Sequence, residues 1–293
     1  MSENPAEAFL ECCFEDSSGV HICFMCSRDE KMIITTEGIV LRQRKIAGNR
    51  RMIVIFTRQY GKISAGTSIN EKSRNKAALA LRPFTFAEYD LFRGREAYSI
   101  NSASVRRSYY SIGEDIDRFM TASAFIEFLD KVTADEEPLP GLYDLAIEFL
   151  ESVSRTTGSS ETLLFAFIVR SLRLLGVSPE MNCCVSCGKQ QSDLTYGKGV
   201  NGKDKMPQFS VTAGGIICDE CAEIEKREGN ALIYRPSFDI IDVFRYFQSK
   251  PLSTFEKVTL KGSAEGMIKK ILAEYTERYL GVDVLSNIGE LEA

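Results

Sequence analysis

Two cysteine pairs constrain the fold of this chain more than any other feature of its sequence. Cys184 and Cys187 form one CxxC pair, Cys218 and Cys221 form a second, and 30 residues separate the pairs. Two such pairs supply four thiolates that can surround a zinc ion tetrahedrally, with Zn–S bonds of about 2.3 Å. Four sulfur ligands leave no coordination position open. The spacing therefore predicts one structural Zn²⁺ per chain, with a polar loop and a short β-ribbon between the pairs.

Other interpretations of the cysteines remain open. A redox-active CxxC usually starts a helix within a βαβ unit, and no such pattern surrounds these pairs. Cys183 lies beside Cys184 and could replace it as a ligand. A second group of possible metal ligands lies near the N-terminus: Cys12, Cys13, His21, Cys23 and Cys26. The favoured interpretation of residues 1–31 is nevertheless a disordered or misassigned extension, with a second metal site as the alternative.

Composition excludes several functional classes. The 293 residues include one histidine, so Ser-His-Asp and HExxH arrangements are not expected. The chain has no GxxxxGK[ST] motif and no carboxylate cluster typical of a nuclease, so we expect a protein that is not an enzyme. No apolar run approaches the roughly 18 residues of a membrane span, and the first residues do not resemble a signal peptide. We expect a cytoplasmic, nucleoid-associated protein.

Charge is distributed unevenly along the chain. Residues 1–31 carry 2 basic and 7 acidic side chains, residues 32–107 carry 15 and 5, and residues 108–293 carry 19 and 29. These segments have net charges of −5, +10 and −10, within a total of −5. A compact cationic segment inside an acidic chain indicates a module that binds a polyanion.

The cationic segment has the pattern of a small β-barrel. β-branched and aromatic residues separated by turn signals predict strands over about 33–43, 50–57, 60–66, 82–92 and 96–106. Residues 71–81 predict a short helix between the third and fourth strands. Five strands with a helix at this position favour an oligonucleotide-binding (OB) fold.

Beyond Tyr110 the hydrophobic period changes from two to 3.6, which is typical of amphipathic helices. We expect helices over about 116–132, 142–153, 159–176, 237–248 and 263–281, with the third buried at the centre. The predicted fold class is α+β multidomain: an N-terminal OB-fold barrel, a helical domain and an inserted four-cysteine zinc module. The predicted boundaries are 1–31 for the extension, 32–107 for the barrel, 108–182 and 226–293 for the helical domain, and 183–225 for the zinc module.

Basic residues of the barrel segment are the candidate nucleic-acid contacts. They flank the two predicted hairpins or lie on the predicted short helix: Arg42, Arg44, Lys45, Arg50, Arg51, Arg58, Lys62, Lys72, Arg74 and Lys76. Aromatic residues lie between them, and most of these are expected inside the barrel: Phe56, Tyr60, Phe84, Phe86, Tyr89, Phe92 and Tyr98. Arginine-rich rims neutralise phosphates without reading sequence, so we expect salt-sensitive binding to the nucleic-acid backbone.

Four stretches in this order resemble the bacterial RecO family of DNA repair and recombination mediators. They are "EGIVLRQRKIAGNRRMIVIFTRQYGKI", "SRNKAALALRPFTFAEYDL", "CVSCGK" followed by "FSVTAGGIICDEC", and "AEYTERYLGVDVLSN". The resemblance covers about residues 32–287 and implies an OB-fold domain, a helical domain and a zinc module ligated by Cys184, Cys187, Cys218 and Cys221. It also implies binding of single- and double-stranded DNA, annealing of complementary strands and loading of recombinase. The implied partners are RecR and the C-terminal tail of single-stranded-DNA-binding protein.

The chain departs from the family pattern at two places. Arg50 and Arg51 stand where the family often has acids, and residues 67–71 read TSINE where it often has a basic run. We therefore expect the basic surface to be displaced toward the first hairpin. A zinc-ribbon transcription or RNA-binding protein remains the alternative, because it would share this charge pattern.

Overall fold

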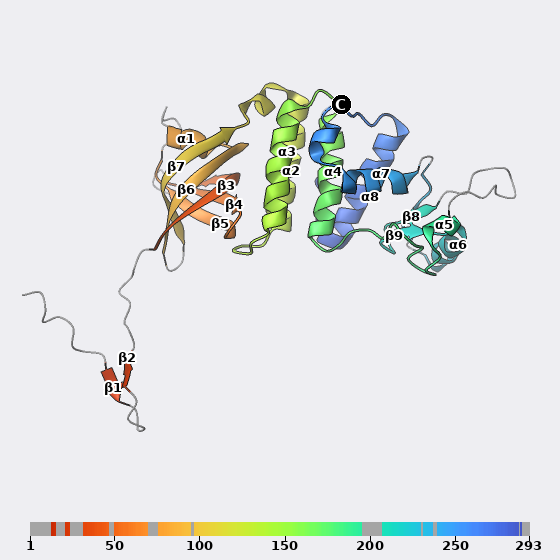
Figure 1. Cartoon of the computed structure of the whole chain (residues 1–293), viewed down its shortest axis with the longest axis horizontal. Helices are drawn as coiled ribbons and strands as arrows, with labels where there is room; N and C mark the ends of the chain where they lie inside the picture. Colours follow the sequence, from red (N-terminus) through yellow and green to blue (C-terminus); the bar gives the residue numbers. More distant parts are fainter. Residues whose placement is uncertain are drawn as a thin grey trace, which may run out of the picture.

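The computed structural model describes residues 13–15, 21–23, 32–46, 50–69, 76–94, 97–194, 207–229, 231–236, 239–286 and 288. From residue 32 onward, three parts lie in a row: a β-barrel, a bundle of helices and a smaller module that contains the cysteine pairs (Figure 1). Among the described residues, no helix combines the length and apolar character needed to cross a membrane.

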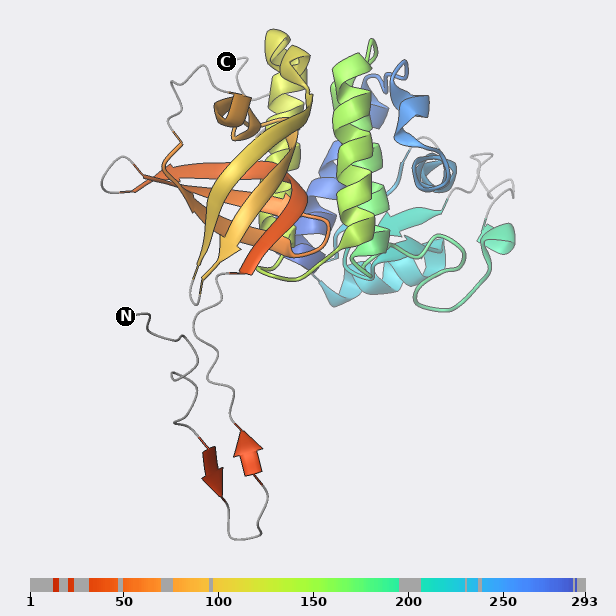
Figure 2. The ribbon, with the colours of Figure 1, turned by 60° about the vertical axis from the view of Figure 1, so that its left-hand side comes forward.

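The barrel has five strands and is closed, as the sequence predicted. Its strands are β3 (Met32–Lys45), β4 (Arg51–Thr57), β5 (Gly61–Thr67), β6 (Thr85–Arg93) and β7 (Tyr98–Ser108). They pair in the order β3-β4-β5-β7-β6, with a parallel pairing of β5 and β7 closing the barrel. The helix α1 (Lys76–Ala80) lies between β5 and β6 in the chain and at one end of the barrel (Figure 2). This is the small OB-like architecture of the prediction.

The predicted fourth strand starts later than expected. Residues 81–84 form a turn, and β6 begins at Thr85. Phe84 has a φ of 57°, in the left-handed region that a bulky L-residue rarely adopts, so the chain reverses there instead of continuing as a strand. Of the predicted 71–81 helix, residues 71–75 lie outside the described residues.

Strand β4 is buried on both faces, which joins the barrel to the helices. Ile53 and Ile55 point into the barrel interior, while Val54 and Phe56 belong to the core that continues into the helical domain. The Phe56 ring meets the Tyr143 ring edge to face, with centroids 5.6 Å apart. The alternation of side chains along a strand therefore lets one strand serve two cores.

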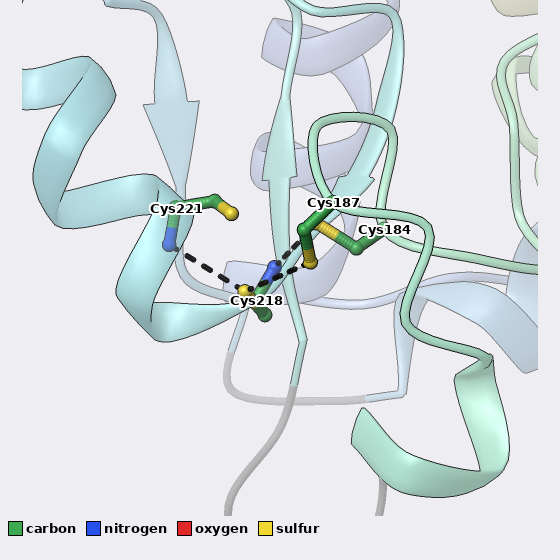
Figure 3. Close-up of side chains that lie close together, drawn as sticks. All are labelled: Cys184, Cys187, Cys218 and Cys221. Carbon is green, nitrogen blue, oxygen red and sulfur yellow. Dashed lines mark hydrogen bonds between the residues drawn. The ribbon is translucent and has the colours of Figure 1, made fainter.

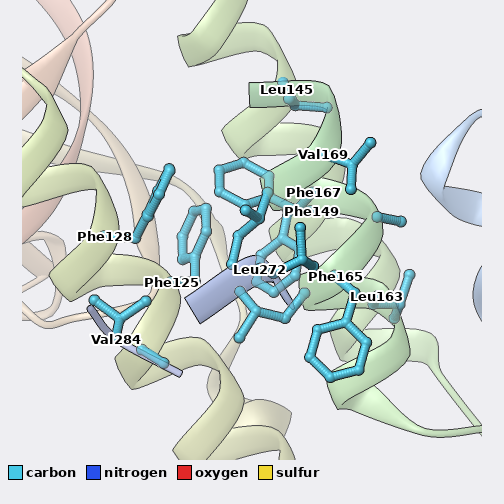
Figure 4. Close-up of a cluster of buried hydrophobic side chains, with 14 of the residues drawn as sticks. Phe125, Phe128, Leu145, Phe149, Leu163, Phe165, Phe167, Val169, Leu272 and Val284 are labelled. Carbon is cyan, nitrogen blue, oxygen red and sulfur yellow. The ribbon is translucent and has the colours of Figure 1, made fainter. Parts of the chain in front are cut away.

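The helical domain packs around one central helix, as predicted. Its helices are α2 (Ile116–Val132), α3 (Pro140–Arg155), α4 (Ser160–Leu174), α7 (Ile240–Ser249) and α8 (Ser263–Leu280), with short 3₁₀ helices η1 (Tyr110–Glu114) and η2 (Leu252–Phe255). Every residue from Leu163 to Val169 of α4 is fully buried. Phe125, Phe149 and Phe167 form an aromatic cluster between α2, α3 and α4, with ring centroids 4.4–5.1 Å apart (Figure 4).

The cysteine module contains the predicted ribbon and helices that were not predicted. Its elements are α5 (Gln191–Leu194), β8 (Gln208–Ser210), β9 (Gly215–Ile217), α6 (Asp219–Glu228) and β10 (Ile233–Tyr234). The Tyr275 hydroxyl on α8 donates to the Val177 carbonyl at 3.1 Å, and the Tyr279 hydroxyl donates to the Val211 carbonyl at 3.2 Å. The Tyr279 bond attaches the module to the helical bundle, and the Tyr275 bond holds the segment between α4 and the module.

In the extension 1–31, predicted to be disordered, the structure describes one short hairpin. Strands β1 (Cys13–Glu15) and β2 (His21–Cys23) pair antiparallel, with Cys13 opposite Cys23. The rest of the extension lies outside the described residues, including Cys12 and Cys26, so its predicted disorder and the possible second metal site stay predictions.

Candidate nucleic-acid interface and metal centre

The first barrel hairpin carries unpaired cations at its tip. Arg44 and Lys45 are the last two residues of β3, and Arg50 immediately precedes β4. All three side chains are exposed, and none makes an ion pair with a residue that the structure describes. Their charges are therefore available to an anionic partner. We call these three residues the hairpin cations.

The second hairpin, between β4 and β5, points its cations at the helical domain. The Arg58 guanidinium donates to both carboxylate oxygens of Asp144 on α3, at 2.9 and 3.0 Å. Lys62 is 8% exposed, and its Nζ donates to the Asp130 carbonyl on α2 at 2.7 Å and lies 3.5 Å from Asp130 Oδ1. Arg58 and Lys62 thus attach the barrel to the acidic helices.

Further ion pairs cross the same boundary. Arg42 lies 3.2 Å from the Asp130 carboxylate, Arg93 lies 3.5 Å from Glu136, and Arg107 pairs with Glu151 on α3. Part of the positive charge of residues 32–107 is therefore neutralised by acidic residues of segment 108–293 in the same chain. Sequence reasoning missed this role, although an acidic segment following a basic one is the signal that could have suggested it.

Arg51 lies inside the molecule rather than on its surface. It is 7% exposed, and its guanidinium donates to the Gln43 side-chain oxygen and to the Ile69 carbonyl, both at 2.8 Å. These bonds hold the chain after β5 against the first hairpin. Lys72 and Arg74 fall outside the described residues, whereas Lys76 on α1 is exposed and has no ion pair with the described part of the chain.

The two cysteine pairs converge on one point in the module at the far end from the barrel. The sulfurs of Cys184, Cys187, Cys218 and Cys221 all lie within 4.8 Å of one another. The Cys187 and Cys218 sulfurs are 3.8 Å apart. Two sulfurs bound tetrahedrally to one metal ion, each at about 2.3 Å, would also be about 3.8 Å apart. Cys184 and Cys187 approach from a loop, and the other pair approaches from the start of α6 (Figure 3). The group could hold a metal ion, and Cys183 is not part of it.

Backbone amides support these sulfurs. The Cys218 amide donates to the Cys184 sulfur and the Cys221 amide donates to the Cys218 sulfur, both at 3.4 Å. Burial tends to raise the pKa of the Cys184 thiol, but hydrogen bonds from the backbone of Cys218, Cys187 and Ser186 lower it to about 7. Burial raises the pKa of both Cys218 and Cys221. A bound cation would supply the charge that lets such crowded thiols ionise together.

The close packing around the second pair requires glycine. A Cβ on Gly215 would lie 2.4 Å from the Glu180 carbonyl oxygen, and the Ile216 amide donates to that same oxygen at 2.9 Å. The strand leading to Cys218 is thereby held against the segment leading to Cys184. Cys218 itself caps the N-terminus of α6, a helix whose start was missed although Asp219 and Glu220 follow the cap.

Comparisons with known proteins cover nearly the whole described chain. Residues 32–109 match the family model "Recombination protein O N terminal", and residues 113–287 match "Recombination protein O C terminal". A DNA repair protein RecO of Alkaliphilus metalliredigens is 27% identical over 244 residues, which cover 83% of this chain and 92% of that relative. A DNA repair protein RecO of Desulforamulus reducens is 28% identical over 250 residues, covering 85% and 90%.

Removal of Lys62 tests its role in attaching the barrel. We expect Lys62→Met to lower the free energy of unfolding by about 2–4 kcal/mol, because it removes the buried ammonium that donates to the Asp130 carbonyl and leaves Arg42 as the remaining cation beside the Asp130 carboxylate. Lys131→Ala is the control, since it removes an exposed pair with Glu127 and should cost less than about 0.5 kcal/mol. Denaturant titration measures both, and equal losses would contradict the assignment.

Single cysteine replacements test the metal centre. We expect the wild-type chain to bind about one metal ion, and Cys218→Ser to lose it and to unfold at lower temperature, because a three-sulfur site binds more weakly. Cys183→Ser is the matched control and should keep the metal. Elemental analysis together with thermal unfolding gives the answer, and loss of metal from the Cys183 variant would show a wrong ligand set.

Proposed function

The chain belongs to the recombination protein O (RecO) family, and from that premise we propose that it is a DNA-binding mediator of recombination that anneals complementary strands. It would also help to load recombinase on DNA coated with single-stranded-DNA-binding protein, together with a RecR-type partner. Membership of a DNA repair family favours this function over that of a zinc-ribbon transcription factor. The observation that carries the proposal is the unpaired charge of Arg44, Lys45 and Arg50 on a barrel whose other cations are largely bound to carboxylates.

The hairpin cations suit annealing because of what they contact. Arginine and lysine on a short ribbon can neutralise phosphates of either single- or double-stranded DNA without occupying the base edges. Two strands held this way repel each other less, and their bases stay free to pair. Neither step needs a nucleotide or a catalytic group.

The metal centre is proposed to bind zinc and to serve the structure alone. Four sulfur ligands would satisfy zinc completely and leave no position for a substrate. Cys184 and Cys187 would hold the segment after α4, and Cys218 and Cys221 would hold the start of α6, so the ion would fasten the module beneath α8. When bound, the metal supplies only a cross-link between these segments.

A hollow between α3 and α4 is the proposed site for the acidic tail of single-stranded-DNA-binding protein. It has a volume of about 390 Å³ and includes Leu145, Arg170, Arg173 and Leu174 in its wall. Arg170 donates to the Glu148 carboxylate at 3.0 and 3.1 Å, whereas Arg173 is exposed and makes no ion pair with any described residue. An unpaired cation beside exposed leucine fits a tail that is both acidic and apolar.

Replacement of the hairpin cations tests the DNA surface. We expect the triple variant Arg44→Ala, Lys45→Ala and Arg50→Ala to bind single-stranded DNA more weakly and to anneal strands more slowly. Loss of three phosphate contacts should reduce the slope of log affinity against log salt by about 2. Fluorescence titrations at several salt concentrations measure this.

Arg106→Ala is the matched control for that variant. Arg106 lies on the same barrel and is half exposed, but it pairs with Glu88, so its removal should leave the salt slope nearly unchanged. An effect of Arg106→Ala one third as large as that of the triple variant would mean that total charge, and not the first hairpin, determines binding.

Arg173→Ala tests the hollow between α3 and α4. We expect about a tenfold loss of affinity for a peptide of the acidic tail, because a charge-assisted contact is removed, with unchanged affinity for DNA. Arg155→Ala, on the same domain but outside the hollow, should bind the peptide normally. Fluorescence anisotropy with labelled peptide gives both affinities, and a normal Arg173 variant would place the tail elsewhere.

A further inference from the structure

A groove lies along the seam between the barrel and the helical domain. It has a volume of about 560 Å³, within the range of about 300–1,000 Å³ typical of ligand sites. One wall is formed by Leu79 of α1 and the turn that includes Arg82 and Phe84, and the other by Tyr110 of η1 and Phe119 of α2. We call it the seam groove; it is distinct from the hairpin cations and from the hollow between α3 and α4.

Large apolar side chains are exposed in this groove. Tyr110 is 71% exposed, Leu79 is 46% exposed and Phe119 is 42% exposed. Phe84 itself is buried, and its ring meets the Phe119 ring edge to face at 5.8 Å, so a core residue of the barrel supports the exposed ring of the helical domain. Such a cluster is costly to leave in water and marks a place where a partner binds.

Phe84 is held in this position at a conformational cost. Its φ of 57° is an outlier for a bulky residue, and the Tyr109 amide donates to the Phe84 carbonyl at 3.1 Å to fix the turn. The same bond joins the barrel to the segment that carries Tyr110. The strained turn thus places the buried Phe84 ring in the wall of the groove, behind Phe119.

Unpaired cations flank the aromatic surface. Arg82 lines the groove and is exposed, and Lys76 precedes Leu79 by three positions on α1, which puts the two on the same side of that helix. Neither cation makes an ion pair with a residue that the structure describes. The groove therefore offers aromatic rings next to positive charge.

This combination selects the chemistry of the occupant. Exposed aromatic rings beside lysine and arginine form the stacking platform with an electrostatic rim by which proteins hold single-stranded nucleic acids. Among the barrel's other aromatic residues, Phe56, Tyr89 and Tyr98 are buried in the cores and cannot receive a base. A purely apolar peptide would not need the cations.

We propose that the seam groove binds one or two unstacked bases of a single DNA strand, with Tyr110 and Phe119 stacking on them and Lys76 and Arg82 contacting the adjoining phosphates. This inference rests on the proposed DNA-binding function and adds a contact to bases that the hairpin cations do not make. Binding at the groove would be specific for single strands, because the bases of a duplex are stacked on one another. It would tolerate any sequence, since every base has a π-face.

Replacement of Tyr110 tests the proposal. Tyr110→Ala should weaken binding of an oligothymidylate roughly fivefold to a hundredfold, the range for loss of one base–aromatic stack, while leaving the salt slope unchanged. Affinity for an abasic oligonucleotide of equal length should not change. Tyr110→Phe keeps the ring and should bind like the wild type.

Ile116→Ala is the matched control, because Ile116 is 69% exposed in the same segment but does not line the groove. Equal losses on oligothymidylate and abasic strands, or no loss on either, would overturn the base-binding assignment while leaving the hairpin cations as the DNA surface. Normal DNA affinity with weakened binding of the tail peptide would assign the groove to a protein partner instead. Failure of the wild-type chain to bind either strand would refute the proposed function itself.

Discussion

Ion pairs between the barrel's cations and the carboxylates of the helical domain decide which of those cations stay available to an external anion. Lys62 and Arg58 are bound by Asp130 and Asp144 of the helical domain, and a cation so bound neutralises little of a phosphate's charge. Lys62 is the decisive case, because a buried ammonium without its carbonyl and carboxylate partners would be costly. These contacts fix one side of the barrel against the helices. The cations at the tip of the first hairpin form no ion pair with an acidic residue of the described chain, so they remain available to an external anion.

The same division explains what the sequence could and could not predict. Hydrophobic period alone distinguished the barrel from the helices, and a run of apolar residues identified α4 as the central helix. A count of charges identified the sign of the barrel but not the direction of each side chain. Arg50 and Arg51 are neighbours in sequence, yet the alternation of a strand turns Arg51 inward to Gln43 and leaves Arg50 outside. Arg51 is held inward by Gln43 and by the Ile69 carbonyl, partners that a local sequence pattern does not identify.

The metal centre was predictable to a finer level because its chemistry is local. The CxxC spacing selected Cys184 over Cys183, and the structure brings only the former into the cluster. What spacing could not show is how the module is attached. The Tyr279 hydroxyl on α8 donates to the Val211 carbonyl of the module, 68 residues away in the chain. The module lies at the opposite end of the molecule from the barrel, so the proposed metal site and the proposed DNA surface are far apart (Figure 1).

The strand annealing proposed here requires that bases be bound reversibly. Stacking of a base on an aromatic side chain contributes about 1–3 kcal/mol, and a base-pair step in a duplex contributes about 1.4 kcal/mol. Because the two are similar, a base bound in the seam groove as proposed would be exchanged for a paired one once a complementary strand arrives. The hairpin cations would keep their phosphates throughout that exchange, since phosphate contacts leave the base edges free. A deeper or more closed groove would trap the strand, so the open, half-exposed rings of Tyr110 and Phe119 suit a transient contact.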